Sequence, residues 1–134
     1  MKILIVEDDF AAGKLMQIWL SNFGQCLVAV DGIEGIKAFQ QALQEEEPYD
    51  LVCLDIMMPE MDGHQALKEI RRLEEARGIG GLDGVKVIMT TALQDSQNVF
   101  GAFREGSEAY LVKPVKKAKL IEVMDQMGIL IHGV

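Results

Sequence analysis

The stretch "ILIVEDDF", residues 3–10, joins four aliphatic residues directly to three acidic ones. An unbroken run of Ile, Leu and Val is typical of a β-strand that is covered on both faces, as in a parallel sheet. Such a strand delivers the carboxylates of Glu7, Asp8 and Asp9 to one place, where they repel each other. The stretch therefore indicates a buried central strand and raises the question of what compensates its acidic end.

Further short apolar runs alternate with helical patterns along the rest of the chain. The predicted strands are Lys2–Val6, Cys26–Val30, Leu51–Leu54, Val85–Met89 and Ala109–Val112. The predicted helices are Phe10–Phe23, Ile33–Glu46, His64–Ala76, Ser96–Glu105 and Lys116–Met127. Five strands that alternate with five helices predict an α/β fold with a parallel sheet and right-handed crossovers. The glycine-rich segment Gly78–Gly84 lacks the strand–helix context of a phosphate-binding fingerprint, so we expect a loop there.

Composition narrows the class of protein. The chain has 134 residues, of which 49% are hydrophobic and 25% charged, which is typical of one globular domain. The net charge of −8 argues against broad nucleic-acid binding and against an anionic membrane surface as partner. Cys26 and Cys53 lie in apolar stretches and are predicted to be buried free thiols. With neither a signal peptide pattern nor a membrane-length apolar run, the sequence predicts a cytoplasmic protein.

Polar residues follow four of the predicted strands. In an open α/β sheet, ligands bind outside the carboxyl ends of the strands. The residues at these ends are Glu7, Asp8 and Asp9 after the first strand, Asp55 after the third, Thr90 and Thr91 after the fourth, and Lys113 after the fifth. Crowded carboxylates resist joint ionisation unless a cation joins them, and their oxygens suit Mg²⁺. Because an amine, a hydroxyl and an attacking carboxylate could then act on a phosphoryl group, the set indicates an aspartyl-phosphate site.

Each of these residues also has a structural interpretation. Asp8 or, more naturally, Asp9 can cap the first helix, and Asp55 can be a turn residue. The two threonines can be ordinary strand residues, and Lys113 can be a solvated surface lysine. Complementary groups at all four strand ends nevertheless favour a site over four coincidences.

Four motifs, in this order and at these strand ends, resemble the receiver domain of two-component response regulators, in the single-domain, chemotaxis-regulator-like form. The motifs are "ILIVEDD" (3–9), "DLVCLDIMMPEMDG" (50–63), "VIMTTA" (87–92) and "AYLVKP" (109–114). The resemblance runs from Lys2 to about Met127. It implies a flavodoxin-like (βα)5 doubly wound sandwich whose five-stranded parallel sheet has the order 2-1-3-4-5. It also implies a receiver domain at residues 1–128 and a short tail at 129–134.

The resemblance assigns roles to the residues at the site. Asp55 would be the phosphoacceptor, assisted by Thr91 and Lys113. Mg²⁺, or Mn²⁺ in its place, would be held by four groups: the side chains of Glu7 (through a water), Asp8 and Asp55, and the backbone carbonyl of Met57. Thr91 and Tyr110 would form the conformational switch, and the peptide bond before Pro114 would be cis.

The resemblance also implies partners. A histidine kinase or a histidine phosphotransfer protein would donate the phosphoryl group in a phosphorelay, and the receiver would catalyse only its own phosphorylation and dephosphorylation. The surface of the fourth helix, fifth strand and fifth helix, with Phe103, Tyr110 and Lys116–Met127, would contact a protein target or form a weak dimer of an otherwise monomeric protein. Nucleic acid and membrane are not expected as partners. Met57 and Leu93 stand at positions that tune the phosphoryl lifetime, and since both are apolar we expect slow self-dephosphorylation.

Other classes of protein remain as alternatives. A flavodoxin-like cofactor binder is disfavoured because acids occupy the loop that would hold a flavin phosphate. A phosphohydrolase is disfavoured because Met57 stands where a general acid would be useful. A receiver-like binding module that is never phosphorylated is disfavoured by the complete set of site residues. Whether the chain acts alone or as part of a longer regulator or hybrid kinase is open.

Overall fold

The computed structural model describes residues 1–58, 60–80, 83–92 and 107–129. Its sheet consists of β1 (Lys2–Val6), β2 (Gln25–Ala29), β3 (Leu51–Asp55), β4 (Lys86–Thr91) and β5 (Ala109–Val112). All neighbouring strands are parallel and their order is β2-β1-β3-β4-β5. The predicted sheet and its strand order are therefore confirmed.

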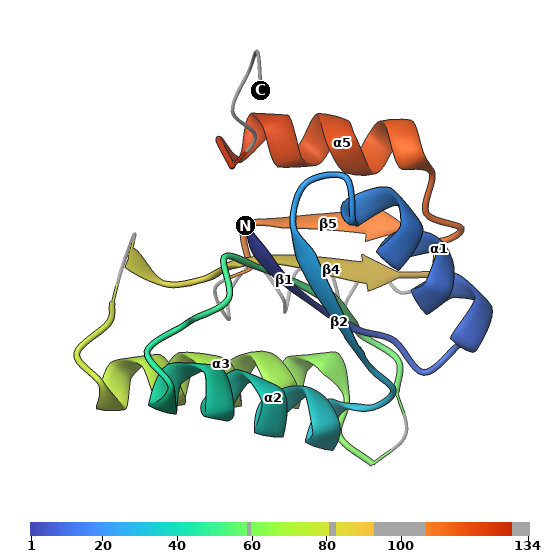
Figure 1. The fold of residues 1–134 in the computed structure, drawn as a ribbon. Coiled ribbons are helices and arrows are strands. Elements are labelled where there is room, and N and C mark those ends of the chain that lie inside the picture. The colour runs from blue at the N-terminus through green and yellow to red at the C-terminus, as the bar shows by residue number, and fades with distance from the viewer. Residues whose placement is uncertain (59, 81–82, 93–106, 130–134) are drawn as a thin grey trace.

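Four helices cover the two faces of this sheet: α1 (Phe10–Leu20), α2 (Gly32–Gln44), α3 (Gly63–Ala76) and α5 (Lys117–Gln126). The predicted helix Ser96–Glu105 lies outside the described residues. In Figure 1, α2 and α3 lie on one side of the sheet and α1 and α5 on the other. Each side has its own apolar core, the first around Phe39, Leu67 and Ile70 and the second around Leu20, Leu120 and Met124. This is the doubly wound arrangement that the alternating pattern predicts.

β1 lies between the two cores and contributes side chains to both, as its sequence predicts. Ile3, Leu4, Ile5 and Val6 expose at most 2% of their surface. Neighbours on the strand contribute to opposite cores, because Leu4 and Val6 face α2 and α3 while Ile3 and Ile5 face α1 and α5. A polar residue in this run would face one core or the other, which explains the unbroken aliphatic sequence.

Two of the element ends that differ from the prediction have a clear structural reason. α1 ends at Leu20 rather than Phe23, because Ser21 Oγ and Asn22 Nδ2 donate to the carbonyls of Ile18 and Trp19 and close the last turn. β4 extends through Thr90 and Thr91 rather than ending at Met89, because these residues still pair with β3 or β5. The other ends differ from the predicted ones by three residues or fewer. Differences of this size are expected, because capping contacts determine where an element ends.

The cysteines are free, with Cys53 buried and Cys26 partly buried, close to the prediction. Burial raises the pKa of the Cys53 thiol to about 12, so this side chain behaves as a small apolar residue. Among the described residues, no helix is both long enough and apolar enough to span a bilayer.

Candidate functional site

The site lies where the carboxyl ends of β1, β3 and β5 meet at one edge of the sheet. Lys113 Nζ lies 3.0 Å from Glu7 Oε1 and 3.0 Å from Asp55 Oδ2. The two carboxylates are almost completely buried, with Glu7 exposing 4% and Asp55 exposing 2% of its surface. The predicted convergence of residues from distant parts of the chain is therefore present, and one amine bridges two buried acids.

Three carboxylates at this edge form a donor set for a cation. Glu7, Asp8 and Asp55 each offer one oxygen, and these oxygens lie within 4.8 Å of one another. Asp55 Oδ2 is buried without a hydrogen bond among the described residues; its contact with Lys113 has the distance of an ion pair but not hydrogen-bond angles. Because buried charged oxygens need a partner, this set fits a hard divalent cation such as Mg²⁺.

The electrostatics of the cluster agree with this interpretation. Burial raises the pKa of Glu7 from 4.5 to about 8; the neighbouring Asp55 carboxylate adds to the shift, and Lys113 opposes it. Burial also works against the charge of Lys113, but its contacts with Asp55 and Glu7 outweigh burial and raise its pKa. Without a cation, Glu7 therefore keeps its proton near neutral pH. A divalent cation would compete with this proton.

Asp9 has a different role from its two acidic neighbours. Its Oδ1 accepts hydrogen bonds from Ala11 N at 2.9 Å and Ala12 N at 3.2 Å, which caps α1. It is absent from the group of converging carboxylates in the described part of the chain. The interpretation of Asp9 as a helix cap is confirmed.

The other predicted site residues lie at or just after the ends of β3, β4 and β5. Thr90 and Thr91 are buried at the end of β4, with Thr90 opposite Asp55 and the Thr91 hydroxyl donating to the Ala92 carbonyl at 3.2 Å. Met57 N donates to Asp55 Oδ1 at 3.1 Å, so the main chain folds back on the acid directly after β3. The Lys113–Pro114 peptide bond is cis.

Gly63 supports the site, and the sequence analysis missed it. A Cβ at this position would lie 2.6 Å from Asp55 O and 2.7 Å from Ile56 Cα, so α3 can begin against the end of β3 only with glycine there. Asp62 and Gln65 form a capping box at the same helix start. The dipeptide Asp62-Gly63 was the available signal, but it shows only that a helix begins, not what lies against it.

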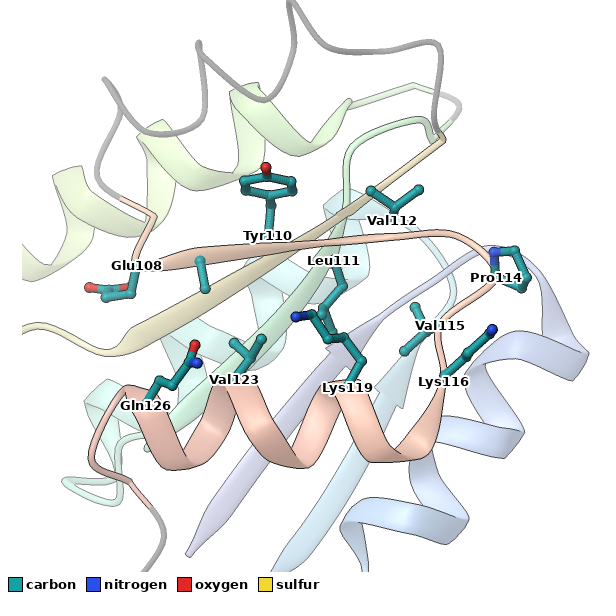
Figure 2. Close-up of a pocket in the computed structure, with 11 residues that line it drawn as sticks. Glu108, Tyr110, Leu111, Val112, Pro114, Val115, Lys116, Lys119, Val123 and Gln126 are labelled. Atoms are coloured by element: carbon teal, nitrogen blue, oxygen red, sulfur yellow. The ribbon is translucent and has the colours of Figure 1, made fainter.

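A groove of about 520 Å³ runs between β5 and α5, next to the turn that carries Lys113. Figure 2 shows Leu111 pointing toward α5, whereas Tyr110 and Val112 point to the opposite side of β5. Tyr110 is 40% exposed and Val112 37% exposed. This half of the predicted output surface is therefore accessible in the described residues; Phe103 lies outside them.

Comparison with known proteins identifies the class of this fold and site. A family model described as "Response regulator receiver domain" matches residues 3–125, so the chain belongs to the response regulator receiver family. Receiver domains act as phosphoacceptors in two-component signalling rather than as conventional enzymes. Solved structures agree on the fold, including the chemotaxis protein CheY4 of Vibrio cholerae, with a TM-score of 0.78 at 21% identity over 93% of this chain and 96% of that one.

Two other solved structures are more similar in sequence. The CheX–CheY–BeF3–Mg²⁺ complex from Borrelia burgdorferi matches with a TM-score of 0.77 and 29% identity over 97% of this chain and 90% of that chain. The receiver domain of the sensor histidine kinase PA1611 from Pseudomonas aeruginosa, which has a magnesium ion in its active-site cleft, matches with a TM-score of 0.75 and 26% identity over 95% and 97%.

Curated relatives are longer proteins. The "DNA-binding dual master transcriptional regulator RpaA" of Synechocystis is 38% identical over 114 residues, which are 84% of this chain and 43% of that protein. The "Probable transcriptional regulator ycf27" of Guillardia theta is 35% identical over 120 residues, or 89% and 42%. The "Sensor protein GacS" of Pseudomonas syringae is 33% identical over 124 residues, or 92% and 13%. The chain thus spans less than half the length of these relatives.

Proposed function

We propose that this chain is a Mg²⁺-dependent phosphoacceptor switch, in which Asp55 takes a phosphoryl group from a histidine kinase or a histidine phosphotransfer protein. The observation that carries the proposal is the state of Asp55: a buried carboxylate with one oxygen lacking a hydrogen bond, 3.0 Å from a lysine and beside two further acids. A purely structural aspartate would have its buried oxygens hydrogen-bonded.

The transfer is a displacement at phosphorus. An Asp55 oxygen forms the new bond to phosphorus as the phosphorus–nitrogen bond of the donor's phosphohistidine breaks, and the imidazole leaves with the bonding electrons. Lys113 neutralises charge on the phosphoryl oxygens, and the Thr91 hydroxyl turns from the Ala92 carbonyl to donate to one of them. Bound Mg²⁺, or Mn²⁺, would supply the remaining positive charge, held by Asp8, Asp55, the Met57 carbonyl and, through a water, Glu7.

The surface that reports phosphorylation to partners should lie at β5 and α5, which border the groove. Movement of Thr91 at the end of β4 is passed to the neighbouring β5, where Val112 is its register partner and Tyr110 lies two residues earlier. The surface of β5 and α5, with the predicted fourth helix that lies outside the described residues, then meets a protein target, or a second receiver in a weak dimer. The domain limit at residue 128 and the cytoplasmic location stay predictions.

The apolar residues at the lifetime positions predict a stable aspartyl phosphate. Met57 lies two residues after Asp55 and its side chain, 60% exposed, cannot orient an attacking water by hydrogen bonding; Leu93 lies outside the described residues. Replacing Met57 by Asn should speed phosphate loss by about fivefold, as expected for one hydrogen bond of about 1 kcal/mol. Fast decay of the wild-type phosphate without a phosphatase would contradict this proposal.

Phosphorylation by acetyl phosphate with Mg²⁺, followed by intact-protein mass spectrometry, tests the central proposal. We expect one phosphoryl adduct on the wild type, none on Asp55→Asn and none with EDTA. Asp50→Asn is the matched control, because Asp50 immediately precedes the other end of β3, where its carboxylate accepts from Lys2 N. Equal labelling of Asp55→Asn and wild type would show that another residue reacts, and no labelling of either would favour a binding module that is never phosphorylated.

A further inference from the structure

β2 forms one edge of the sheet and pairs only with β1 among the described residues; Figure 1 shows it as the frontmost strand. Gln25 N donates to Met1 O, and Ala29 O accepts from Glu7 N, so these two residues direct their backbone groups toward β1. Because direction alternates along a strand, Cys26 and Val28 direct their N–H and C=O groups away from the sheet. Within the described ranges, no hydrogen-bond partner is present for these outward groups.

This edge lacks the charged side chains and prolines that often protect edge strands against pairing with another strand. Edge strands are commonly protected by charged side chains, proline or bulges. The stretch from Gln25 to Val30, "QCLVAV", has no charge and no proline. Two of its large apolar side chains are strongly exposed, Leu27 at 47% and Val30 at 52%. The edge therefore offers both unpaired backbone groups and apolar surface.

We propose that β2 pairs with β2 of a second copy of this chain, in antiparallel orientation, so that the two five-stranded sheets become one continuous sheet. A second copy fits because an antiparallel pair of identical strands is self-complementary about a two-fold axis. The distribution of charge is compatible with this occupant. Two chains that each carry a net charge of −8 repel each other, but residues 24–30 carry no charge, so pairing this stretch with itself brings no like charges opposite each other.

The geometry selects one register. With Leu27 on the two-fold axis, Cys26 stands opposite Val28 of the other copy, and each such pair exchanges two backbone hydrogen bonds. The exposed Leu27 side chain then packs against its own symmetry mate. Val30 stands opposite Gly24, and the first charged residue on this side, Asp31, falls beyond the last pair. In this register, the outward-facing backbone N–H and C=O groups of the uncharged stretch all form hydrogen bonds with the second copy.

Sedimentation velocity over a wide range of concentration tests the proposal. We expect a reversible dimer that tightens as NaCl is raised, because salt screens the repulsion between the two acidic chains. Leu27→Lys places two like charges on the axis and should raise the dimer Kd by about tenfold or more. Leu15→Lys is the matched control, because Leu15 on α1 is 48% exposed and lines a cavity with Lys113 and Val115, which follow β5 at the other side of the sheet. Circular dichroism confirms that both variants fold.

A disulfide across the axis tests the register independently of the lysine variant. Residues at position 27 form a non-hydrogen-bonded antiparallel pair, whose Cα separation of about 4.5 Å is within the range of disulfides. In a Cys26→Ala background, Leu27→Cys should be oxidised to a covalent dimer by glutathione disulfide, which is reduced to two glutathione molecules. Leu15→Cys in the same background should cross-link far more slowly.

Three outcomes would overturn the pairing at β2. The first is a wild-type monomer at every concentration and salt level. The second is a dimer that survives Leu27→Lys but is lost when Tyr110 or Val112 is changed, which would place the contact at β5. The third is equal cross-linking at positions 15 and 27. None of these results depends on phosphorylation, so the pairing and the proposed function stand or fall separately.

Discussion

The fold strongly changes the chemistry of Glu7. Its pKa is raised from 4.5 to about 8, chiefly by burial, so the folded protein without metal binds a proton that the unfolded chain releases. The free energy of unfolding of the metal-free protein should therefore fall as the pH rises from 4.5 through about 8. A cation that replaces this proton compensates the negative charge of the buried Glu7 carboxylate. Metal binding is therefore coupled to pH.

We expect the affinity for Mg²⁺ to rise with pH, by up to about tenfold per pH unit, and to level off above the Glu7 pKa. Trp19 offers a readout, because it is the single tryptophan of the chain and lines a cavity together with Glu7 and Lys113. Fluorescence titration at several pH values measures the affinity, and calorimetry in buffers of different ionisation enthalpy measures the released proton. Glu7→Gln should bind more weakly and without pH dependence. Binding without proton release in the wild type would contradict the coupling.

Asp8 and Asp9 are neighbours with separate roles, which substitution should separate. Asp8→Asn should weaken Mg²⁺ binding by about tenfold or more, because Asp8 belongs to the converging carboxylates. Asp9→Asn should leave binding nearly unchanged, since an amide oxygen still caps α1. Asp9→Ala should lower the free energy of unfolding by about 1 kcal/mol in urea denaturation. A large loss of Mg²⁺ affinity in Asp9→Asn would assign Asp9 to the metal site instead.

At the scale of elements, a polar network joins the end of α3 to the beginnings of β4 and β5. Glu74, 4% exposed, accepts from Val85 N at 2.6 Å and pairs with Arg71 at 2.8 Å. Arg71 also donates to the Val85 carbonyl at 3.0 Å and pairs with Glu108 at 3.2 Å. Glu108 in turn accepts from Val87 N at 2.6 Å. The network gives hydrogen-bond partners to backbone groups of Val85 and Val87. These residues precede Ile88, the first residue of β4 that pairs with β5.

Glu74→Leu should lower the free energy of unfolding by about 2 to 3 kcal/mol, because it leaves the buried Val85 N–H without an acceptor and Arg71 with one carboxylate fewer. Glu69→Leu is the matched control on the same helix. Glu69 pairs with Arg72 at the surface, where solvent screens the interaction, so its urea midpoint should stay near that of the wild type. Similar midpoints for the two variants would show that the network is not a source of stability.

The elements show how far local patterns reach. Runs such as Ile3–Val6 predict their strands because burial on both faces demands apolar residues at every position. The buried Glu74 is not predictable in this way. Helical spacing puts Glu74 on the same face of α3 as Leu67 and Ile70, but its residue type predicts a solvent-exposed side chain, because glutamate is rarely buried without a partner. Its partner Val85 is eleven residues away and becomes visible only in the folded chain.

At the scale of the whole molecule, the position of the site was predictable because topology determines it. Once the strands are parallel, their carboxyl ends share one edge, and Asp55 and Lys113 must meet there. The close approach at Gly63 was not predictable, since it depends on the distance between two elements rather than on the identity of either. The edge position of β2, by contrast, follows from the predicted strand order 2-1-3-4-5.

We expect the acidic cluster of Glu7, Asp8 and Asp55 to make the stability of the entire domain depend on a bound cation. A ligand that binds only the folded state adds about 2.7 kcal/mol at a hundred times its Kd, so Mg²⁺ should raise the melting temperature and EDTA should lower it. Asp8→Asn should be at least as stable as the wild type in EDTA, because it removes one of three crowded carboxylates, and should gain little from Mg²⁺. The two melting curves should therefore exchange order when Mg²⁺ is added. NaCl at equal ionic strength screens the charges of the carboxylates but does not fill the site, so it should not reproduce this exchange. If NaCl does reproduce it, general screening and not a bound cation compensates the three carboxylates.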